Sequence, residues 1–285
     1  MRSSDEIKRL VLNIAERDDR IRAVLLNGSR ANTKIQPDKY QDFDLVFLVN
    51  HFHDFVSDRD WIEVFGEKLI RQLPDEMDLG YPEDKKNPAF HYLTLLKDGN
   101  RIDLTVLPSD RPDRYHFDSL TLVWLDKDNL FSGMPAPDDS DFIIKKPSQK
   151  QFTDTCNEFW WVSTYVAKGL VRNEIIHSKE MLEKFLRPMF MKIIEWYVGF
   201  NTNFSVSPGK SGKFIQKYLP PELYGGILKT YSDDQLKNNW QSLFAMLELF
   251  GQFAGSVAEG LQLNYNKEEG INVTSYIRKL YRERY

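Results

Sequence analysis

The chain has 285 residues, of which 41% are hydrophobic, and this length allows one large folded domain or two of moderate size. No run approaches the ~20 apolar residues that a membrane-spanning helix needs, and the single cysteine, Cys156, excludes an intrachain disulfide. A formal charge of −4 lacks the basic excess of a nucleic-acid-binding protein, so we expect a cytoplasmic protein with neither nucleic acid nor membrane as partner.

The first half of the chain has the pattern of a mixed helix and strand domain. Ser3 and Glu6 are spaced as in a capping box, and the apolar residues that follow recur at helical spacing, which predicts an N-terminal helix. Short apolar runs predict strands over 21–27, 43–49, 91–97, 101–107 and 120–125. A helix is expected between Trp61 and Leu73. Asp98-Gly99-Asn100 predicts a hairpin turn.

The second half is expected to be helical. The stretch 132–150 contains several prolines and aspartates and is interpreted as the linker between two domains. Helices are predicted over 152–172, 179–200, 233–261 and 273–284. The predicted fold class is therefore α+β, with a mixed β-sheet domain over residues 1–135 and a helical bundle domain over residues 136–285.

Gly28 and Ser29 end the first predicted strand. Glycine lets the backbone approach a ligand closely. If a helix starts directly after it, free N–H groups and the Ser29 hydroxyl can bind a phosphate. Arg30 adds a positive charge at the same point, and it either contacts phosphate or braces the loop.

Asp42 and Asp44 mark the start of the second predicted strand. Side chains two residues apart in a strand lie on the same face, so both carboxylates project together. Two adjacent carboxylates repel, and burying them unpaired is costly. A divalent cation resolves the conflict, and magnesium prefers carboxylate and phosphate oxygens. The pair therefore predicts a metal site suited to phosphoryl transfer.

Asp103 supplies a third carboxylate. In the run 101–107, apolar Ile102, Leu104 and Val106 alternate with polar residues, so Asp103 points away from the core. If this strand neighbours the second one, the three carboxylates form a cluster. Asp103 then either binds the metal or accepts the proton of an attacking hydroxyl. A lone Gly-Ser is usually a turn and a lone Asp-x-Asp a solvated strand edge, but their combination favours a catalytic site.

These motifs resemble the signature of the DNA polymerase β-type nucleotidyltransferase superfamily. The segments 98–105, 125–130 and 156–160 further resemble the bacterial aminoglycoside 6-adenylyltransferases, over nearly the whole chain. This resemblance implies transfer of AMP from ATP to the 6-hydroxyl of streptomycin with Mg²⁺, releasing pyrophosphate and inactivating the antibiotic. It also implies that Asp42 and Asp44 form the metal-binding pair, Ser29 binds phosphate within the Gly28–Arg30 segment, and Asp103 is the third carboxylate.

A polar and aromatic stripe is expected on the helix over 152–172. Glu158, Trp161, Tyr165 and Lys168 follow one another at helical spacing, opposite a core stripe. Facing the active site, Glu158 would bind a guanidinium or accept the acceptor's proton, Trp161 and Tyr165 would contact the substrate, and Lys168 would reach phosphate. The alternative is an amphipathic helix with a partly exposed aromatic side chain, and the resemblance favours the substrate-binding interpretation.

Two other functions are compatible with the motifs. One is a nucleotidyltransferase with a different acceptor, such as another antibiotic, a tRNA end or a protein side chain. The other is a non-catalytic nucleotide-binding or interaction protein that retains the fold, but nothing structural requires such a protein to keep all three carboxylates.

Overall fold

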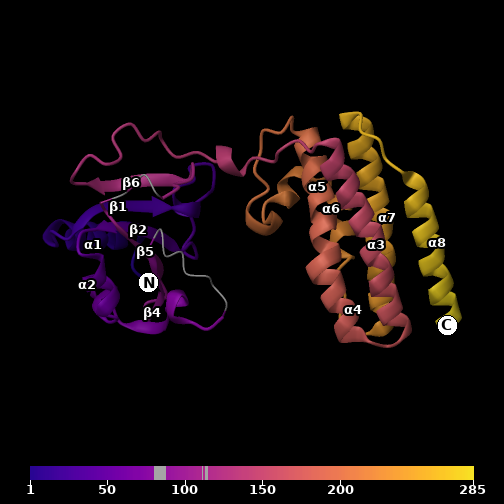
Figure 1. The fold of residues 1–285 in the computed structure, drawn as a ribbon, viewed down its shortest axis with the longest axis horizontal. Coiled ribbons are helices and arrows are strands. Elements are labelled where there is room, and N and C mark those ends of the chain that lie inside the picture. The colour runs from indigo at the N-terminus through magenta and orange to yellow at the C-terminus, as the bar shows by residue number, and fades with distance from the viewer. Residues whose placement is uncertain (80–87, 111, 113–114) are drawn as a thin grey trace. The chain divides into compact units, whose positions relative to one another are not determined.

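The chain folds into two compact units, Met1–Asp141 and Phe142–Tyr285. Figure 1 shows both in the computed structural model, which describes residues 1–79, 88–110, 112 and 115–285. The division falls inside the stretch 132–150, and the placement of a boundary after residue 135 stays a prediction. Within the described ranges, no helix is both long and apolar enough to cross a membrane.

A mixed sheet forms the centre of the first unit. Its strands are β1 (Ile21–Asn27), β2 (Phe43–Val49), β3 (Lys68–Gln72), β4 (Phe90–Leu96), β5 (Arg101–Pro108) and β6 (Thr121–Asp126), in the order β3-β4-β5-β2-β1-β6. Strands β2 and β5 are parallel, and the other neighbouring pairs are antiparallel. The helices of this unit are α1 (Ser4–Arg17) and α2 (Phe52–Ser57). A mixed sheet followed by a helical unit confirms the predicted α+β class.

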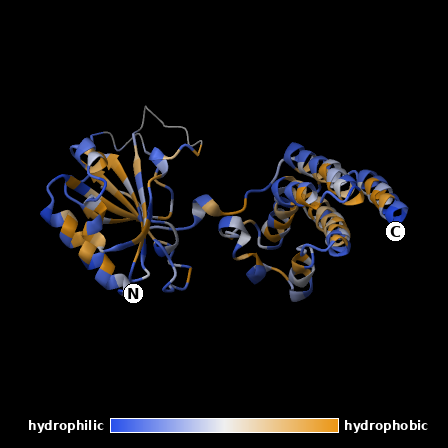
Figure 2. Ribbon diagram, turned by 90° about the horizontal axis from the view of Figure 1, so that it is seen from below, coloured by the Kyte–Doolittle hydropathy of each residue, from blue (hydrophilic) through white to orange (hydrophobic). Residues whose placement is uncertain are grey.

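The two faces of the sheet are different because side chains alternate along each strand. One face buries the larger core of the unit, in which Phe47 and Leu45 meet Ile7 and Val11 of α1. The opposite face carries a smaller apolar cluster formed by Ala23, Leu25, Val46, Leu48 and Leu107. Figure 2 shows the hydrophobic strands at the centre of this unit. Asp44 and Asp103 lie on this second face as well, at the end of β2 and β5 where both strands begin.

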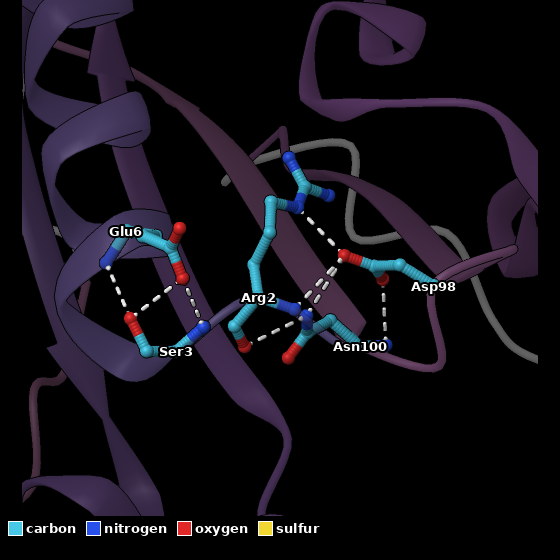
Figure 3. A network of polar contacts seen from close by, with 5 residues as sticks. All are labelled: Arg2, Ser3, Glu6, Asp98 and Asn100. Atoms are coloured by element: carbon cyan, nitrogen blue, oxygen red, sulfur yellow. Dashed lines mark hydrogen bonds and ion pairs between the residues drawn. The ribbon is translucent and has the colours of Figure 1, made fainter.

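The segment before α1 is fastened to the turn between β4 and β5 (Figure 3). Ser3 and Glu6 form the expected capping box, with the Ser3 N–H donating to Glu6 Oε2 at 2.7 Å. Arg2 Nε donates to Asp98 Oδ2 at 2.6 Å, and the Asn100 N–H donates to Asp98 Oδ1 at 2.9 Å. These contacts hold Asn100, the residue before β5, in place. The antiparallel pairing of β4 with β5 on either side of this turn confirms the predicted hairpin.

The helix expected between Trp61 and Leu73 is a wrong prediction. Residues Trp61–Phe65 form a short 3-10 helix, which ends where Gly66 adopts a φ of 134°. The following residues form β3, an edge strand paired with β4, whose Leu69 and Ile70 side chains are each 65% exposed. The strand forms because it pairs with β4. Its own sequence does not predict a strand, because neighbouring apolar residues that are both exposed do not alternate with polar ones.

The second unit is a bundle built from α3 (Gln149–Val171), α4 (Ile175–Met181), α5 (Arg187–Asn201), α6 (Pro221–Leu228), α7 (Leu236–Leu261) and α8 (Lys267–Arg284). Helices α3, α5 and α7 run side by side in Figure 1. The expected helix over 179–200 consists of the end of α4, a π-helical turn over Leu182–Leu186, and α5. In the core, the rings of Phe159 and Phe250 stack 3.6 Å apart.

Candidate active site

Four polar side chains form a row across four adjacent strands of the sheet. In register, Asp44 of β2 lies opposite Asp103 of the parallel strand β5 and opposite Asn27 of the antiparallel strand β1. Asn27 in turn lies opposite Thr121 of β6. Residues directly opposite one another point to the same face of a sheet, so Asp103, Asp44, Asn27 and Thr121 share one face.

Gly28 follows this row directly and packs against Asp44. Its φ of 71° lies in the left-handed region, and a Cβ at this position would lie 2.5 Å from Asp44 Oδ2. Glycine is therefore required both for the backbone conformation and for the position of the carboxylate. The strand is followed by a three-residue 3-10 turn, Gly28–Arg30. The expected phosphate site therefore does not have the free N–H groups of an α-helix N-terminus, which were part of the reason for predicting it.

Ser29 lies in that turn, half-buried, and its carbonyl oxygen accepts a hydrogen bond from Gln41 Nε2 at 3.3 Å. This contact joins the turn to the segment that enters β2. It places Ser29 beside the chain that carries Asp42, which supports the expected phosphate-binding position without testing it.

Arg30 braces the loop, which is one of the two roles considered from the sequence. Its Nε donates to the Asp42 carbonyl oxygen at 2.9 Å, and its Nη2 donates to the Gln41 carbonyl oxygen at 2.7 Å. Nη1 donates to Ser4 Oγ at 2.7 Å, and the guanidinium lies 3.7 Å from the centre of the Phe43 ring. With its donors engaged in this way, Arg30 holds the backbone of Asp42 in position.

Arg101 lies among the three carboxylates, and the sequence reasoning missed it. Its Nε and Nη2 donate to the two oxygens of Asp103, at 2.8 Å and 2.6 Å. Its Nε also lies 3.8 Å from Asp42 Oδ2. The pKa of Asp42 is raised above its usual value, mainly because burial disfavours the charged carboxylate. The positive charge of Arg101 lowers this pKa, and the negative charge of Asp103 raises it. Arg101 could have been predicted from its position, because it precedes Asp103 by two residues in β5 and therefore lies on the same face of the sheet.

The carboxylates fit a divalent cation by their chemistry. All candidate ligand atoms are carboxylate oxygens, and the space beside Asp44 depends on the absence of a side chain at Gly28. As placed, however, no three His, Cys, Asp or Glu residues in the described part of the chain lie close enough together to hold a metal ion. In this arrangement both oxygens of Asp103 accept hydrogen bonds from Arg101.

Two residues of the polar row have atoms without a hydrogen-bond partner. Asn27 Oδ1 and Thr121 Oγ1 are both buried, and neither has a partner within the described ranges. Thr121 as a whole is only 3% exposed. Buried polar atoms are nearly always hydrogen-bonded in folded proteins, so a water or a ligand group at this end of the row would complete the hydrogen bonding of these two atoms. The sequence reasoning missed both residues.

The expected stripe on α3 is present in the second unit. Phe152, Cys156 and Phe159 are buried on one side of the helix, while Glu158 and Lys168 are exposed on the other. On this exposed side Trp161 is 60% exposed, and its Nε1 donates to the Tyr165 hydroxyl at 2.6 Å. These side chains lie on one face of α3, and its participation in the active site stays a prediction.

A mixed sheet that carries Gly-Ser and three carboxylates on adjacent strands defines the site of a nucleotidyltransferase. The model of the family described as "Streptomycin adenylyltransferase" matches residues 1–280. An aminoglycoside 6-adenylyltransferase of Campylobacter jejuni is 42% identical over 93% of this chain and 91% of its own length. The enzyme of the same name from Bacillus subtilis is 38% identical over 99% of each chain.

A crystal structure of an aminoglycoside 6-adenyltransferase from Bacillus subtilis is 34% identical, covers 99% of each chain and has a TM-score of 0.48. From the family match and the sequence identities, the chain belongs to the streptomycin adenylyltransferase family. It is therefore an enzyme of the nucleotidyltransferase class.

Proposed function

We propose that this enzyme transfers AMP from ATP to a hydroxyl of an aminoglycoside, the 6-hydroxyl of streptomycin, with Mg²⁺ as the divalent cation. The observation that carries the proposal is the pair Asp44 and Asp103 on one face of the sheet, with Gly28 beside Asp44 and with Asp42 just before β2 and near Arg101. Its support is the family match, which extends over nearly the whole chain. Because the donor is ATP, we place the reaction in the cytoplasm.

In the proposed reaction the drug hydroxyl attacks the α-phosphorus of ATP. A new O–P bond forms, the bond to the bridging oxygen breaks, and pyrophosphate leaves with the electron pair of that bond. Asp42 and Asp44 would hold Mg²⁺, with Asp103 as a further ligand, and the bound ion would neutralise charge on the phosphates. Ser29 would bind phosphate, and Arg30 would act through the Asp42 backbone that it braces.

The proton of the attacking hydroxyl goes to a carboxylate. Asp103 and Glu158 are the two candidates, and they belong to different units. Asp103 is held by Arg101 through both oxygens, and each oxygen accepts one hydrogen bond from the guanidinium. Glu158 is exposed and its side chain is within the stripe on α3.

We assign acceptor binding to the second unit. Glu158 carries a carboxylate that suits the planar donors of the guanidinium groups of streptomycin. Trp161 presents a large exposed ring on which a guanidinium can lie, and its hydrogen bond to Tyr165 fixes the two rings relative to each other. Lys168 would contact phosphate from the same helix face.

The test is an assay of the purified protein with MgATP and a panel of streptomycin, kanamycin and gentamicin. Pyrophosphate release measures turnover, and mass spectrometry identifies the product. The expected result is streptomycin carrying one AMP, with little or no reaction of the other two drugs. Modification of another acceptor would correct the substrate and leave the reaction class standing. Absence of both turnover and ATP binding would favour a non-catalytic interaction protein, whereas ATP binding without turnover would favour a non-catalytic nucleotide-binding protein.

Glu158→Gln tests the assignment of the second unit. If Glu158 binds a guanidinium, the variant should raise KM for streptomycin more than KM for ATP. If Glu158 is the proton acceptor, kcat should collapse while KM for streptomycin changes little. Unchanged values of both constants would remove Glu158 from the site.

A further inference from the structure

Arg101 occupies the place where positive charge is needed among the carboxylates. Its guanidinium makes a two-pronged hydrogen bond to Asp103 and approaches Asp42 to 3.8 Å. Asp103 lies opposite Asp44 in register, and the charge of Asp44 also acts on the guanidinium. The Arg101 side chain is 44% exposed, and it can therefore leave this position without opening the core.

The charges support the same arrangement. The hydrogen bond to Asp103 is the main cause that raises the pKa of Arg101, burial lowers it, and the negative charges of Asp103, Asp42 and Asp44 raise it further. Carboxylates this close repel one another, and the guanidinium of Arg101 supplies a compensating positive charge. The nearby Arg30 donates to backbone carbonyl oxygens and to Ser4, so it does not take this role.

We propose that Arg101 is a positioning residue that stands in for the divalent cation: it holds Asp103 in the metal-free enzyme and is displaced when the cation binds. This inference rests on the proposed function. Two cations at one group of carboxylates repel each other, and the bidentate pair turns both oxygens of Asp103 toward the guanidinium. Binding of the metal and pairing of Arg101 with Asp103 are therefore coupled unfavourably.

The coupling has a measurable consequence. Removing the charge of Arg101 relieves the competition, so the metal should bind more tightly even when no nucleotide is present. The same change leaves the carboxylates without a counter-charge, so the metal-free protein should become less stable and regain more stability on adding metal than wild type does. If Arg101 merely supported the fold, replacing it would not increase the affinity for the metal.

The experiment is a titration of the full chain with Mn²⁺ in the absence of nucleotide, with free Mn²⁺ measured by electron paramagnetic resonance. Arg101→Gln is expected to bind Mn²⁺ about tenfold more tightly than wild type. Arg22→Gln is the matched control, because Arg22 pairs with Asp128 elsewhere in the same unit, and it should bind Mn²⁺ as wild type does. Circular dichroism verifies that each variant is folded.

Arg101→Lys is the second variant. It keeps the charge but loses the two-pronged geometry, so it is expected to bind Mn²⁺ more tightly than wild type and less tightly than Arg101→Gln. If Arg101→Gln does not fold, the comparison of Mn²⁺ binding between Arg101→Lys and wild type is the test. Equal or weaker Mn²⁺ binding by the folded variants, with wild type binding Mn²⁺, overturns the role of Arg101 and leaves the proposed function intact. If neither wild type nor variants bind Mn²⁺, with or without ATP, both proposals fail.

Discussion

Replacing Gly28 by alanine is expected to separate the chemistry of the site from the stability of the fold. The added Cβ would lie 2.5 Å from Asp44 Oδ2, so this oxygen must retreat by about 0.9 Å to reach an ordinary contact distance of 3.4 Å. A displacement of this size in a catalytic group can cost on the order of 100-fold in rate. The positive φ of Gly28 adds a backbone penalty of about 1–2 kcal/mol for a residue with a Cβ.

The assay measures pyrophosphate release with MgATP and streptomycin, and urea unfolding followed by circular dichroism gives the free energy of unfolding. Gly133→Ala is the matched control, because Gly133 also has a positive φ, 93°, but nothing lies within 4 Å of its missing Cβ. The control should lose a similar amount of stability and keep wild-type turnover. Wild-type turnover of Gly28→Ala, or an equal loss of turnover in Gly133→Ala, would refute the reasoning.

Four further changes test the rest of the site. Asp44→Asn should lower turnover by at least about 100-fold with the fold intact, and wild-type turnover would remove Asp44 from the metal site. Asp103→Asn should also abolish most turnover; an ATP titration at fixed Mg²⁺ distinguishes a lost proton acceptor, which spares binding, from a lost metal ligand, which weakens it. Thr121→Val removes a buried hydroxyl without a described partner, so the free energy of unfolding should stay the same or rise by about 1 kcal/mol. A rise in KM for ATP in this variant would mark a substrate contact, whereas an unchanged KM would exclude one. For Asp98, burial opposes the shift, but hydrogen bonds from Asn100 and Arg2 outweigh it and lower the pKa below its usual value of 3.8. Its stabilisation is therefore present above that value and is lost as the pH falls through the lower pKa of the folded state, so the stability difference between wild type and Asp98→Asn should shrink below about pH 4. A difference that stays constant with pH would contradict this assignment.

The carboxylates could be placed on one face from the sequence because strand geometry is local. The alternation of Ile102, Leu104 and Val106 with polar residues requires Asp103 to point away from the larger core, and the structure buries these three apolar side chains in it. The capping box at Ser3 and the turn at Gly99 were predictable for the same reason, since both depend on residues only a few positions apart.

The composition of the site depends on register, which the sequence does not contain. Only the pairing of β2 with β5 brings Asp44 opposite Asp103, and only the pairing of β1 with β6 brings Asn27 opposite Thr121. The role of Arg30 was left open for a similar reason. Its partners are the backbone of Asp42 and the side chain of Ser4, and neither contact follows from a spacing rule.

The predicted helices and strands differ from the observed ones in two places, and each difference has its own physical cause. Strand β3 contains two exposed apolar residues and forms because β4 offers it hydrogen bonds, so a local pattern could not identify it. The break in the expected helix over 179–200 is a π-helical turn, which changes the hydrogen-bond spacing while the apolar periodicity continues across it.

The first residues of the chain, Arg2 before α1 and Ser4 at its start, contact the parts of the chain that carry the carboxylates. Ser4 accepts a hydrogen bond from Arg30, which holds Asp42, and Arg2 grips the turn from which β5 starts. A hollow of about 290 Å³, lined by Arg2, Arg30 and Asn100 among other residues, lies at this junction. The position of the carboxylates is therefore set partly by residues that lie outside the carboxylate group, at the beginning of the chain.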